Sequence, residues 1–344
     1  MSNGCPLPHA EEERLQLGHG TGGLLTGELL DTLLLPALGA VPPGPLEDAA
    51  LLPGDYELVL STDGFVVNPL FFPGGDIGSL SVHGTVNDLA MRGALPVALA
   101  LTVIAEEGMP LAELRTVLQS VGKAARGCAV AVITGDTKVV ERGAVDRLFL
   151  TTTGVGRRIP GLTPSAAHAR PGDAVLLSGP IGLHGTAVLS TREGLGFETA
   201  IASDSRPLHR LVHALGPLGA GLHTLRDPTR GGLAATLNEI ARDSRVGVEV
   251  DEQAIPVPEP VAAACDLLGL DPLAVANEGC LVAFVAPHQA DAALAAMRST
   301  HEGASAVVVG RAVAGPAGRV VMRTRMGARR VIEMPRGEQL PRIC

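Results

Sequence analysis

A proline-rich stretch in the middle of the chain, RRIPGLTPSAAHARPGD at residues 157–173, most constrains what this sequence can fold into. Proline fixes one backbone angle and lacks the amide proton that helices and sheets use, so such a stretch ends regular structure on both sides. The parts before and after it each fall within the roughly 100 to 200 residues usual for one domain. The sequence therefore predicts two domains joined by this linker.

The first half of the chain reads strand, helix, strand, helix, strand, strand. Apolar residues at helical spacing, closed by Gly93 and Gly127, predict helices over 76–93 and 110–127. Another helical signal, at 25–38, precedes loop-forming residues 39–55. Runs of β-branched or apolar residues predict strands over 56–63, 95–105, 129–136 and 146–156.

The second half mixes strands and helices without the strict alternation of a doubly wound sheet. Strands are predicted over 174–180, 246–251, 280–287 and 306–313, and helices over 206–215, 231–243, 260–269 and 289–299. The pattern predicts an α+β fold of two domains. Its parts are a Gly-rich segment and helix at 1–42, an N-terminal domain with a mixed sheet at 43–158, and a C-terminal α+β domain at 170–322. Residues 323–344 are predicted to form a mobile arm.

Composition narrows the function classes. Apolar residues make up 46% of the chain and aromatic residues only 2%, which predicts an aliphatic core. The formal net charge is -9 and the basic residues are scattered, which argues against nucleic-acid binding. There is no signal-peptide pattern, and no apolar stretch reaches the ~18 to 20 residues of a membrane span. We expect a soluble cytoplasmic protein that binds neither nucleic acid nor membranes.

The five cysteines form neither a CxxC pair nor an even set, so a disulfide framework or zinc knuckle is not expected. Cys128, Cys265 and Cys280 lie in apolar runs and are expected to be buried. Cys5 and Cys344 lie in the chain ends. Cys344 is the last residue, in PRIC, where a thiol is either incidental or a group that the protein presents to a partner.

Four aspartates stand at the ends of predicted strands or in loops: Asp48, Asp63, Asp88 and Asp136. Each alone is typical of a turn or a cap. Magnesium prefers carboxylate oxygens and leaves positions for water and phosphate. If strands 56–63 and 129–136 are neighbours, with Asp88 on the helix packed against them, these residues could meet at one magnesium-nucleotide site.

Two Gly-rich stretches fit the same idea. GHGTGG, Gly18 to Gly23, can turn backbone N–H groups toward a phosphate through Gly20, Gly22 and Gly23, and FFPGGD at 71–76 precedes a helix. On its own, GHGTGG is more typical of a flexible loop than of a phosphate site. Neither stretch has the Lys-Ser/Thr pair of a Walker A motif, and a dinucleotide fingerprint is absent.

Several longer motifs carry a more specific signal, a resemblance to a known family. The runs at 61–94, 133–143 (ITGDTKVVERG) and 225–241 (LRDPTRGGLAATLNEIA), with ANEG at 276–279 and the closing PRIC, resemble the HypE family of hydrogenase maturation proteins. That family belongs to the superfamily of aminoimidazole ribonucleotide synthetase (PurM), selenophosphate synthetase and thiamine-monophosphate kinase. The resemblance runs from HGTGG to the last residue, and it implies a two-domain PurM-like architecture.

The resemblance also implies an activity. Members of the family receive a carbamoyl group on the terminal thiol from the carbamoyltransferase HypF and dehydrate it with ATP to a thiocyanate. The cyanide passes through the HypC-HypD complex to the iron of [NiFe]-hydrogenases. The implied cofactors are ATP and Mg²⁺, and the implied assembly is a homodimer that pairs its N-terminal sheets. Phosphorylating the carbamoyl oxygen would turn a poor leaving group into phosphate.

Residue by residue, the family pattern places Asp48, Asp63, Asp88 and Asp136 at the metal and nucleotide phosphates and Asn87 at the nucleotide. Cys344 carries the substrate. Lys138 is expected to meet a phosphate or the carbamoyl oxygen. Glu278 is the leading candidate for the base, and His83 a weaker one. Asp227, Thr229 and Arg230 fit either a structural turn or a phosphate contact at a helix entrance.

Two alternatives stay open. The first is another enzyme on the same scaffold. A selenophosphate synthetase would need a reactive Cys or selenocysteine followed by a Lys in the N-terminal Gly-rich segment, and no Lys follows Cys5 there. A small-molecule kinase would not need a terminal thiol. The second is a non-catalytic carrier of a group on the tail, which would have no use for a magnesium-nucleotide site.

Overall fold

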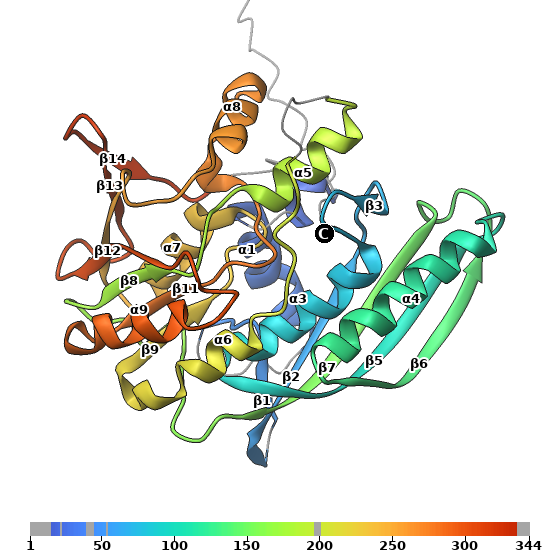
Figure 1. Ribbon diagram of the computed structural model, residues 1–344, viewed down its shortest axis with the longest axis horizontal. Helices are drawn as coiled ribbons and strands as arrows, with labels where there is room; N and C mark the ends of the chain where they lie inside the picture. The colour runs from blue at the N-terminus through green and yellow to red at the C-terminus, as the bar shows by residue number, and fades with distance from the viewer. Residues whose placement is uncertain (1–14, 21–22, 39–44, 53, 196–200, 336–344) are drawn as a thin grey trace, which may run out of the picture.

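The computed structural model describes residues 15–20, 23–38, 45–52, 54–195 and 201–335. Two sheets form the body, one in each half of the chain, and helices pack around and between them (Figure 1). The predicted α+β fold of two domains is therefore confirmed. Among the described residues, no helix is long and apolar enough to cross a membrane.

The first sheet has five strands in the order β1-β2-β7-β5-β6. Neighbouring strands are antiparallel except β5 and β6, which are parallel, so the sheet is mixed as predicted. The strands are β1 (Ala50–Leu52), β2 (Asp55–Phe65), β5 (Ala94–Glu106), β6 (Ala131–Val140) and β7 (Leu148–Arg158). A short ribbon of β3 (Phe71–Phe72) and β4 (Gly75–Asp76) leads into the first long helix.

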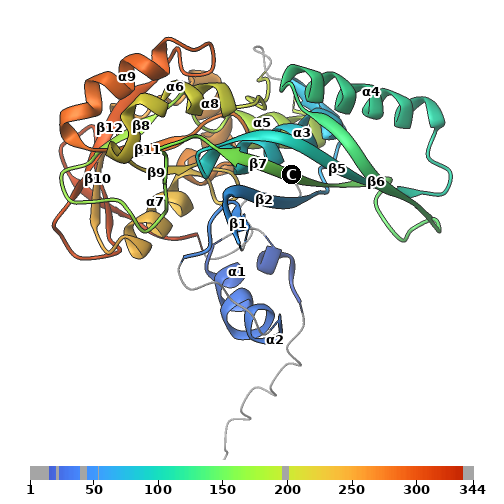
Figure 2. The same cartoon turned by 90° about the horizontal axis from the view of Figure 1, so that it is seen from below.

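Helices α3 (Ile77–Met91) and α4 (Leu111–Gly127) lie on one face of this sheet (Figure 2). Asp76 caps α3 by accepting hydrogen bonds from the N–H groups of Gly78 and Ser79, so the chain enters the helix at a fixed angle. Gly78 lets α3 approach α4 closely, since a Cβ there would lie 2.4 Å from the Val117 carbonyl oxygen.

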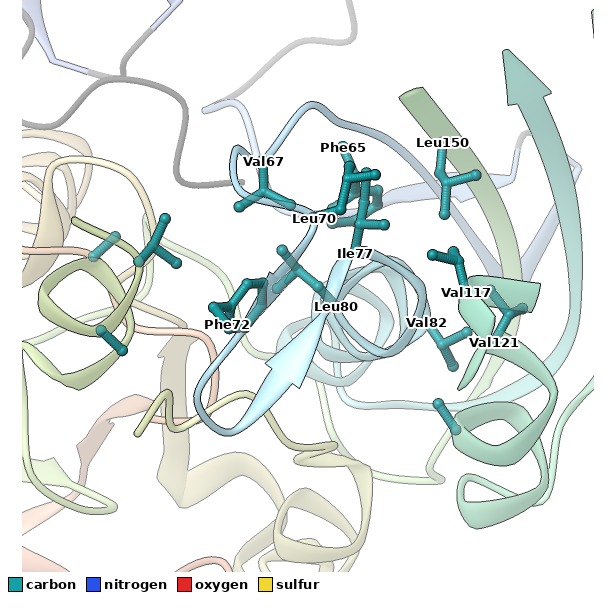
Figure 3. Packing of buried hydrophobic residues seen from close by; sticks show 14 of the residues in the cluster. Phe65, Val67, Leu70, Phe72, Ile77, Leu80, Val82, Val117, Val121 and Leu150 are labelled. Carbon is teal, nitrogen blue, oxygen red and sulfur yellow. The ribbon is translucent and has the colours of Figure 1, made fainter. Parts of the chain in front are cut away.

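The core of the first domain surrounds α3. Leu80 and Val82 on this helix pack with Phe65 of β2, Val117 of α4 and Leu150 of β7 (Figure 3). Most residues of α3 are buried, because the helix contacts the sheet on one side and α6 of the second domain on another. The helix is therefore held rigidly between the two domains, and so is any functional side chain on it.

The second sheet has seven strands in the order β14-β13-β10-β12-β8-β11-β9. They are β8 (Ala174–Leu177), β9 (Leu222–Arg226), β10 (Gly247–Asp251), β11 (Val282–Val285), β12 (Val307–Val313), β13 (Val320–Arg323) and β14 (Arg329–Ile332). The helices of this half are α5 (Leu183–Arg192), α6 (His209–Ala214), α7 (Gly232–Asp243), α8 (Glu259–Leu268) and α9 (Ala290–Arg298). Apolar clusters on the two faces of β8 and β11 bring α7 to one face and α6 with α9 to the other.

The N-terminal helical signal at 25–38 is confirmed, with an irregular centre. A 3-10 turn, η1 (Leu17–Gly20), comes before α1 (Leu24–Leu29), and a π-helix, η2 (Leu30–Leu34), joins α1 to α2 (Leu35–Leu38). None of these residues is buried. The helices project from the body on the side of the first sheet away from α3 and α4 (Figure 2).

The predicted boundary of the C-terminal arm is wrong. Residues 323–344 were expected to be mobile, but β14 pairs antiparallel with β13 inside the second sheet, and Ile332 is 3% exposed. Val320 and Met322 of β13 and Ile332 of β14 are buried on one face of this hairpin, which outweighs the charge of the segment. The remainder of the arm, residues 336–344 with Cys344, lies outside the described residues.

Candidate active site

A polar cavity of about 270 Å³ opens between the two domains. The first domain contributes the end of β2, the middle of α3 and the loop before β1. The second domain contributes the loop from β9 to α7, the face of α7 and the loop before β11. The cavity is lined by Asp48, Thr62, Asp63, Gly84, Asp88, Arg226, Asp227, Thr229, Arg230, Thr236, Glu239 and Glu278.

Three of the four predicted metal aspartates meet here. Asp63 lies near the end of β2 and accepts a hydrogen bond of 2.8 Å from the N–H of Gly64. Asp88 points from α3 and accepts a hydrogen bond of 2.6 Å from the Ser61 hydroxyl. Asp48 comes from the loop before β1 and lies 3.1 Å from the Arg226 guanidinium. Residues far apart in the sequence are thus brought into one cavity by β2, α3 and the loop before β1.

The second domain contributes both acidic and basic side chains to the cavity. Arg226, at the end of β9, pairs with Asp48 and also with Glu239 of α7 at 2.7 Å. Asp227 follows at the turn into α7. Arg230 lies at the same turn, and its guanidinium donates a hydrogen bond of 3.4 Å to the carbonyl oxygen of Gly20. Acidic side chains outnumber the two arginines, so the cavity is suited to a cation or a cation-bound anion.

The crowding of carboxylates changes their acidity. Burial, and then the charges of Asp227 and Asp48, raise the pKa of Asp88 well above its usual range. Burial also raises the pKa of Asp63, of Asp48 and of Glu278, and it raises the pKa of Asp227 to about 6. For Arg226, burial alone would lower the pKa, but Asp48 and Glu239 outweigh it and raise the pKa. A strained acidic cluster of this kind is relieved by a bound cation.

One carboxylate oxygen in this cluster is suited to act as a metal ligand. Oδ2 of Asp48 is buried and has no hydrogen-bond partner among the described residues. An orphaned carboxylate oxygen in a buried site costs free energy that a cation would remove. No three His, Cys, Asp or Glu side chains in the described parts of the chain are already gathered as a metal site. An ion such as Mg²⁺ still fits these residues, because it needs only one or two carboxylates and completes its shell with water and phosphate oxygens.

Glu278 is brought to the same cavity by an irregular loop, residues 277–280, before β11. Its side chain is 3% exposed and lines the cavity. After burial, the charges of Asp227, Asp204 and Asp63 raise its pKa further, and Arg230 lowers it. A carboxylate with a raised pKa is a stronger base once it has lost its proton.

Two other predicted residues lie beside the cavity rather than in its lining. Asn87 is fully buried, with its amide donating to the carbonyl oxygens of Arg206 and Glu278 and accepting from the N–H of Leu208. His83 bonds the Ser205 hydroxyl at 3.1 Å, and burial, followed by the charge of His209, lowers its pKa to about 4. Both side chains join α3 to the second domain. Neither faces the cavity, so the structure does not place Asn87 against a nucleotide or His83 against the reacting group.

Asp136 and Lys138 lie elsewhere. They pair with each other at 2.9 Å on β6, where their side chains are 57% and 64% exposed, and that pairing lowers the pKa of Asp136. The condition for Asp63 and Asp136 to meet, that β2 and β6 are neighbours, is not fulfilled, since β7 and β5 lie between these strands. Three strand spacings put Asp136 about 14 Å across the sheet from Asp63. Within one chain these two residues do not join the acidic cavity.

The Gly-rich segment contacts the end of the body. The N–H of Leu24 donates a hydrogen bond of 3.1 Å to the carbonyl oxygen of Pro335. Gly23 has a φ of +89°, and a Cβ there would lie 2.3 Å from the same oxygen, so only glycine fits. Gly20 bonds Arg230. Gly22 lies outside the described residues.

Several lining residues escaped the sequence analysis as site residues. Arg226, Glu239, Thr62 and Thr236 carry no local signal, because an Arg ending a strand or a Glu on a helix is ordinary in sequence. Asp227 and Arg230 were noted in the motif RDPTRGG, which fits either a structural turn or a phosphate contact. Both residues line the cavity, where Arg230 adds a positive charge beside the carboxylates.

Comparison with known proteins first identifies the class of protein to which the chain belongs. The model of the AIR synthase related protein N-terminal domain matches residues 46–158, and that of the C-terminal domain matches residues 170–323. With a mixed sheet in each half and an acidic cavity between them, the chain has the two-domain architecture of the AIR synthase related proteins.

Closer relatives fix the family. The chain is 53% identical to carbamoyl dehydratase HypE of Cupriavidus necator, over 96% of this chain and 95% of that protein. The crystal structure of a HypE-HypF complex matches with a TM-score of 0.86 and 44% identity, covering 89% of this chain and 99% of that one. The crystal structure of hydrogenase maturation protein HypE in complex with ATP matches with a TM-score of 0.81 and 48% identity, covering 95% and 98%. The chain belongs to the HypE family.

Proposed function

We propose that this chain is an ATP-dependent carbamoyl dehydratase of [NiFe]-hydrogenase maturation. It converts an S-carbamoyl group on Cys344 to a thiocyanate, the source of the cyanide ligand of the active-site iron. One observation carries the proposal: the segment that leads to Cys344 is fixed at Pro335 against the Gly-rich segment, whose Gly20 bonds Arg230 of the acidic cavity. Related proteins named carbamoyl dehydratase, matching nearly the whole chain, support the same activity.

The reach of the tail supports this arrangement. Residues 336–344 follow the Pro335 anchor, and nine extended residues span at most about 30 Å. This is about two fifths of the reach of an arm that begins at residue 323. Because the anchor lies beside the loop that carries Arg230 and Asp227, the thiol of Cys344 is within range of the cavity and of the solvent beside it.

The chemistry needs ATP because an amide oxygen is a poor leaving group. The carbamoyl oxygen attacks the γ-phosphorus of ATP, and ADP leaves. The nitrogen then gives up its two protons, the carbon–oxygen bond breaks, phosphate departs with that oxygen, and a carbon–nitrogen triple bond forms on the sulfur. A structure of a related HypE with ATP supports nucleotide binding here.

Glu278 is the base that we assign to the nitrogen protons. It is buried in the cavity, and its raised pKa favours taking up a proton. Arg230, which lines the same cavity, is suited to an anionic phosphate. One or two of the carboxylates Asp48, Asp63, Asp88 and Asp227 would hold Mg²⁺. When bound, magnesium would neutralise phosphate charge.

Partners follow from the same proposal. HypF is the carbamoyl donor, supported by the crystal structure of a related HypE-HypF complex. The HypC-HypD complex is the cyanide acceptor that the family resemblance implies. The reaction also accounts for a thiol at the last residue, because a group at the end of a tail can meet a donor, a cavity and an acceptor in turn.

A homodimer is the assembly that we propose. Figure 2 shows α3 and α4 on one face of the first sheet and only the N-terminal helices near the other. Leu60 faces that open side and is 38% exposed, and Ile133 on the edge strand β6 is 70% exposed. A second copy would cover this surface. Asp136 and Lys138 on β6 would then lie at the interface, where they could face the partner's site.

Mass spectrometry of the C-terminal peptide tests the activity. The protein is incubated with HypF, carbamoyl phosphate and ATP, and the peptide that contains Cys344 is compared with and without ATP. A carbamoyl adduct should form and then become lighter by one water only when ATP is present. Cys5→Ala serves as the matched control and should behave like the natural protein. An unmodified Cys344 in all samples would refute the proposal.

A further inference from the structure

Asp204 has no part in the mechanism above, yet it contacts the loop that carries Glu278. It lies in the stretch 203–208, which runs between α3 of the first domain and the loop at 277–280. One carboxylate oxygen accepts a hydrogen bond of 3.1 Å from the N–H of Glu278, and the other accepts one of 3.0 Å from the N–H of Gly279. A single carboxylate therefore holds two successive N–H groups, and charge-assisted bonds of this kind are stronger than neutral ones.

Other polar groups of this loop, residues 277–280, are also hydrogen-bonded. Asn87 donates to the carbonyl oxygen of Glu278, and the Arg206 guanidinium donates to that of Gly279 at 2.8 Å. The Asn277 side chain accepts from the N–H of Gly182 and donates to the carbonyl oxygen of Pro228. The loop has no helix or strand of its own to fix it, so these side chains set its shape.

Contact between Asp204 and the loop is tight. A Cβ on Gly279 would lie 1.8 Å from the backbone oxygen of Asp204, so no other residue fits there. The segment that carries Asp204 is anchored to the first domain as well, since the N–H of Ser203 donates to the carbonyl oxygen of Pro73 at 2.8 Å. A displacement of Asp204 would therefore move the backbone at Glu278 and change where its side chain enters the cavity.

We propose that Asp204 is a positioning residue of the dehydration reaction, which orients the Glu278 carboxylate toward the cavity and strengthens it as a base through its own negative charge. This inference rests on the role assigned to Glu278 under Proposed function. Geometry carries it: two hydrogen bonds to the main chain of one residue and its neighbour, and close packing that excludes any side chain at Gly279. In its ionised form Asp204 also raises the pKa of Glu278, after burial and the charge of Asp227. Burial raises the pKa of Asp204 itself, while its hydrogen bonds from Glu278 and Gly279 and the charges of His184 and Arg206 lower it.

The test uses the full chain carbamoylated on Cys344, with Asp204→Asn as the variant. An asparagine keeps the shape but offers one oxygen, so one N–H loses its partner and the charge is removed. The kcat of dehydration should fall at least tenfold, while the Kd for ATP stays within twofold. Because Glu278 acts in its deprotonated form and Asp204 raises its pKa, the acid limb of the kcat profile should move to lower pH in the variant.

A second variant separates charge from geometry. Asp204→Glu keeps the charge but displaces the carboxylate, so kcat should fall while the acid limb stays in place. This variant carries the test if Asp204→Asn does not fold. Asp266→Asn, an exposed position on α8, is the control and should match the natural protein in both readouts.

Each outcome has a defined meaning. Unchanged kcat in both Asp204 variants, or a fall in Asp204→Asn without a shift of the acid limb, would overturn the positioning role. Full dehydration by Glu278→Gln would instead overturn the base assigned under Proposed function, whatever the Asp204 variants do. If Glu278→Gln is inactive and the Asp204 variants are normal, only the present inference fails.

Discussion

At the scale of single residues, Glu278 carries the largest expected effect on the chemistry. Replacing it with Gln keeps the size of the side chain and removes the base, so the rate of thiocyanate formation should fall by about 10² to 10⁴. ATP binding should persist, because the nucleotide contacts assigned to Asp63, Asp88 and Arg230 remain. Single-turnover mass spectrometry of the Cys344 peptide measures the rate, and calorimetry measures binding.

The matched control for this variant is Glu107→Gln, at an exposed turn after β5. It should leave the rate unchanged. If Glu278→Gln forms thiocyanate at the normal rate, another group removes the nitrogen protons.

Asp227 gives a prediction about stability and pH. Its pKa is raised from 3.8 to about 6 in the folded protein. A carboxyl group with a raised pKa in the folded state adds stability below its unfolded pKa, and that stability is lost as the pH rises through the folded value. The free energy of unfolding of the ligand-free protein should therefore fall between about pH 4 and pH 6, with Asp227 contributing on the order of 2 kcal/mol.

Urea unfolding at pH 4 and pH 7 measures this fall. In Asp227→Asn the fall should be smaller, since one titrating group is gone, and the variant should be the more stable protein at pH 7. Asp266→Asn should keep the full pH dependence. An identical pH dependence in Asp227→Asn and the natural protein would mean that Asp227 is not buried among like charges.

Local sequence placed some of the site residues and not others. Asp63 and Asp88 could be assigned to a strand end and a helix from the patterns around them. Their convergence with Asp48 and Glu278 depends on long-range packing, which the pattern of aspartates raised as a possibility for Asp48 and which the family resemblance alone suggested for Glu278. Asp136 and Lys138 show the limit of that reasoning, because their motif is clear while the order of strands that separates them from Asp63 has no signal in the sequence.

At the scale of elements, the contact between the Gly-rich segment and Pro335 predicts a defect in tail-dependent catalysis. Gly23→Ala requires a side chain where φ is +89° and where the Pro335 oxygen lies 2.3 Å away, so the anchor should be displaced. The rate of dehydration should fall several-fold with ATP affinity unchanged. Gly27→Ala, where a Cβ meets nothing within 4 Å, is the control and should be neutral or slightly stabilising.

Measuring both rate and ATP affinity decides between two roles of the segment. If the affinity for ATP falls by the same factor as the rate in Gly23→Ala, the segment binds the nucleotide, as GHGTGG suggested in sequence. If only the rate falls, the segment holds the base of the tail.

The elements themselves were predictable where their periodicity is strong. Helix α4 has a polar and an apolar side, and α3 is marked by Asp76 and Gly93 at its ends, so both were predicted within a residue or two. Helix α5 was missed because it is buried on most sides and lacks a polar face. Strands β13 and β14 were missed because their arginines and flanking turns resemble a solvated arm, while Val320 and Ile332 bury the other face.

At the scale of the whole molecule, the exposed apolar edge of the first sheet predicts association. Ile133→Asp would place a charge on β6 at the surface that a second copy is proposed to cover. Light scattering should then report a monomer for this variant and the proposed dimer for the natural protein. Leu111→Asp is the matched control, because Leu111 is 76% exposed on α4, which lies on the opposite face of the sheet. If the two variants behave alike, the dimer does not form through β6.

The central claim concerns the whole reaction: the carbamoyl oxygen on Cys344 leaves as phosphate. The most direct measurement labels that oxygen with ¹⁸O, adds ATP, and follows the label by mass spectrometry of the released phosphate and of the water. The account predicts one ¹⁸O atom in each inorganic phosphate and thiocyanate on Cys344. Recovery of the label in water, with unlabelled phosphate, would contradict it.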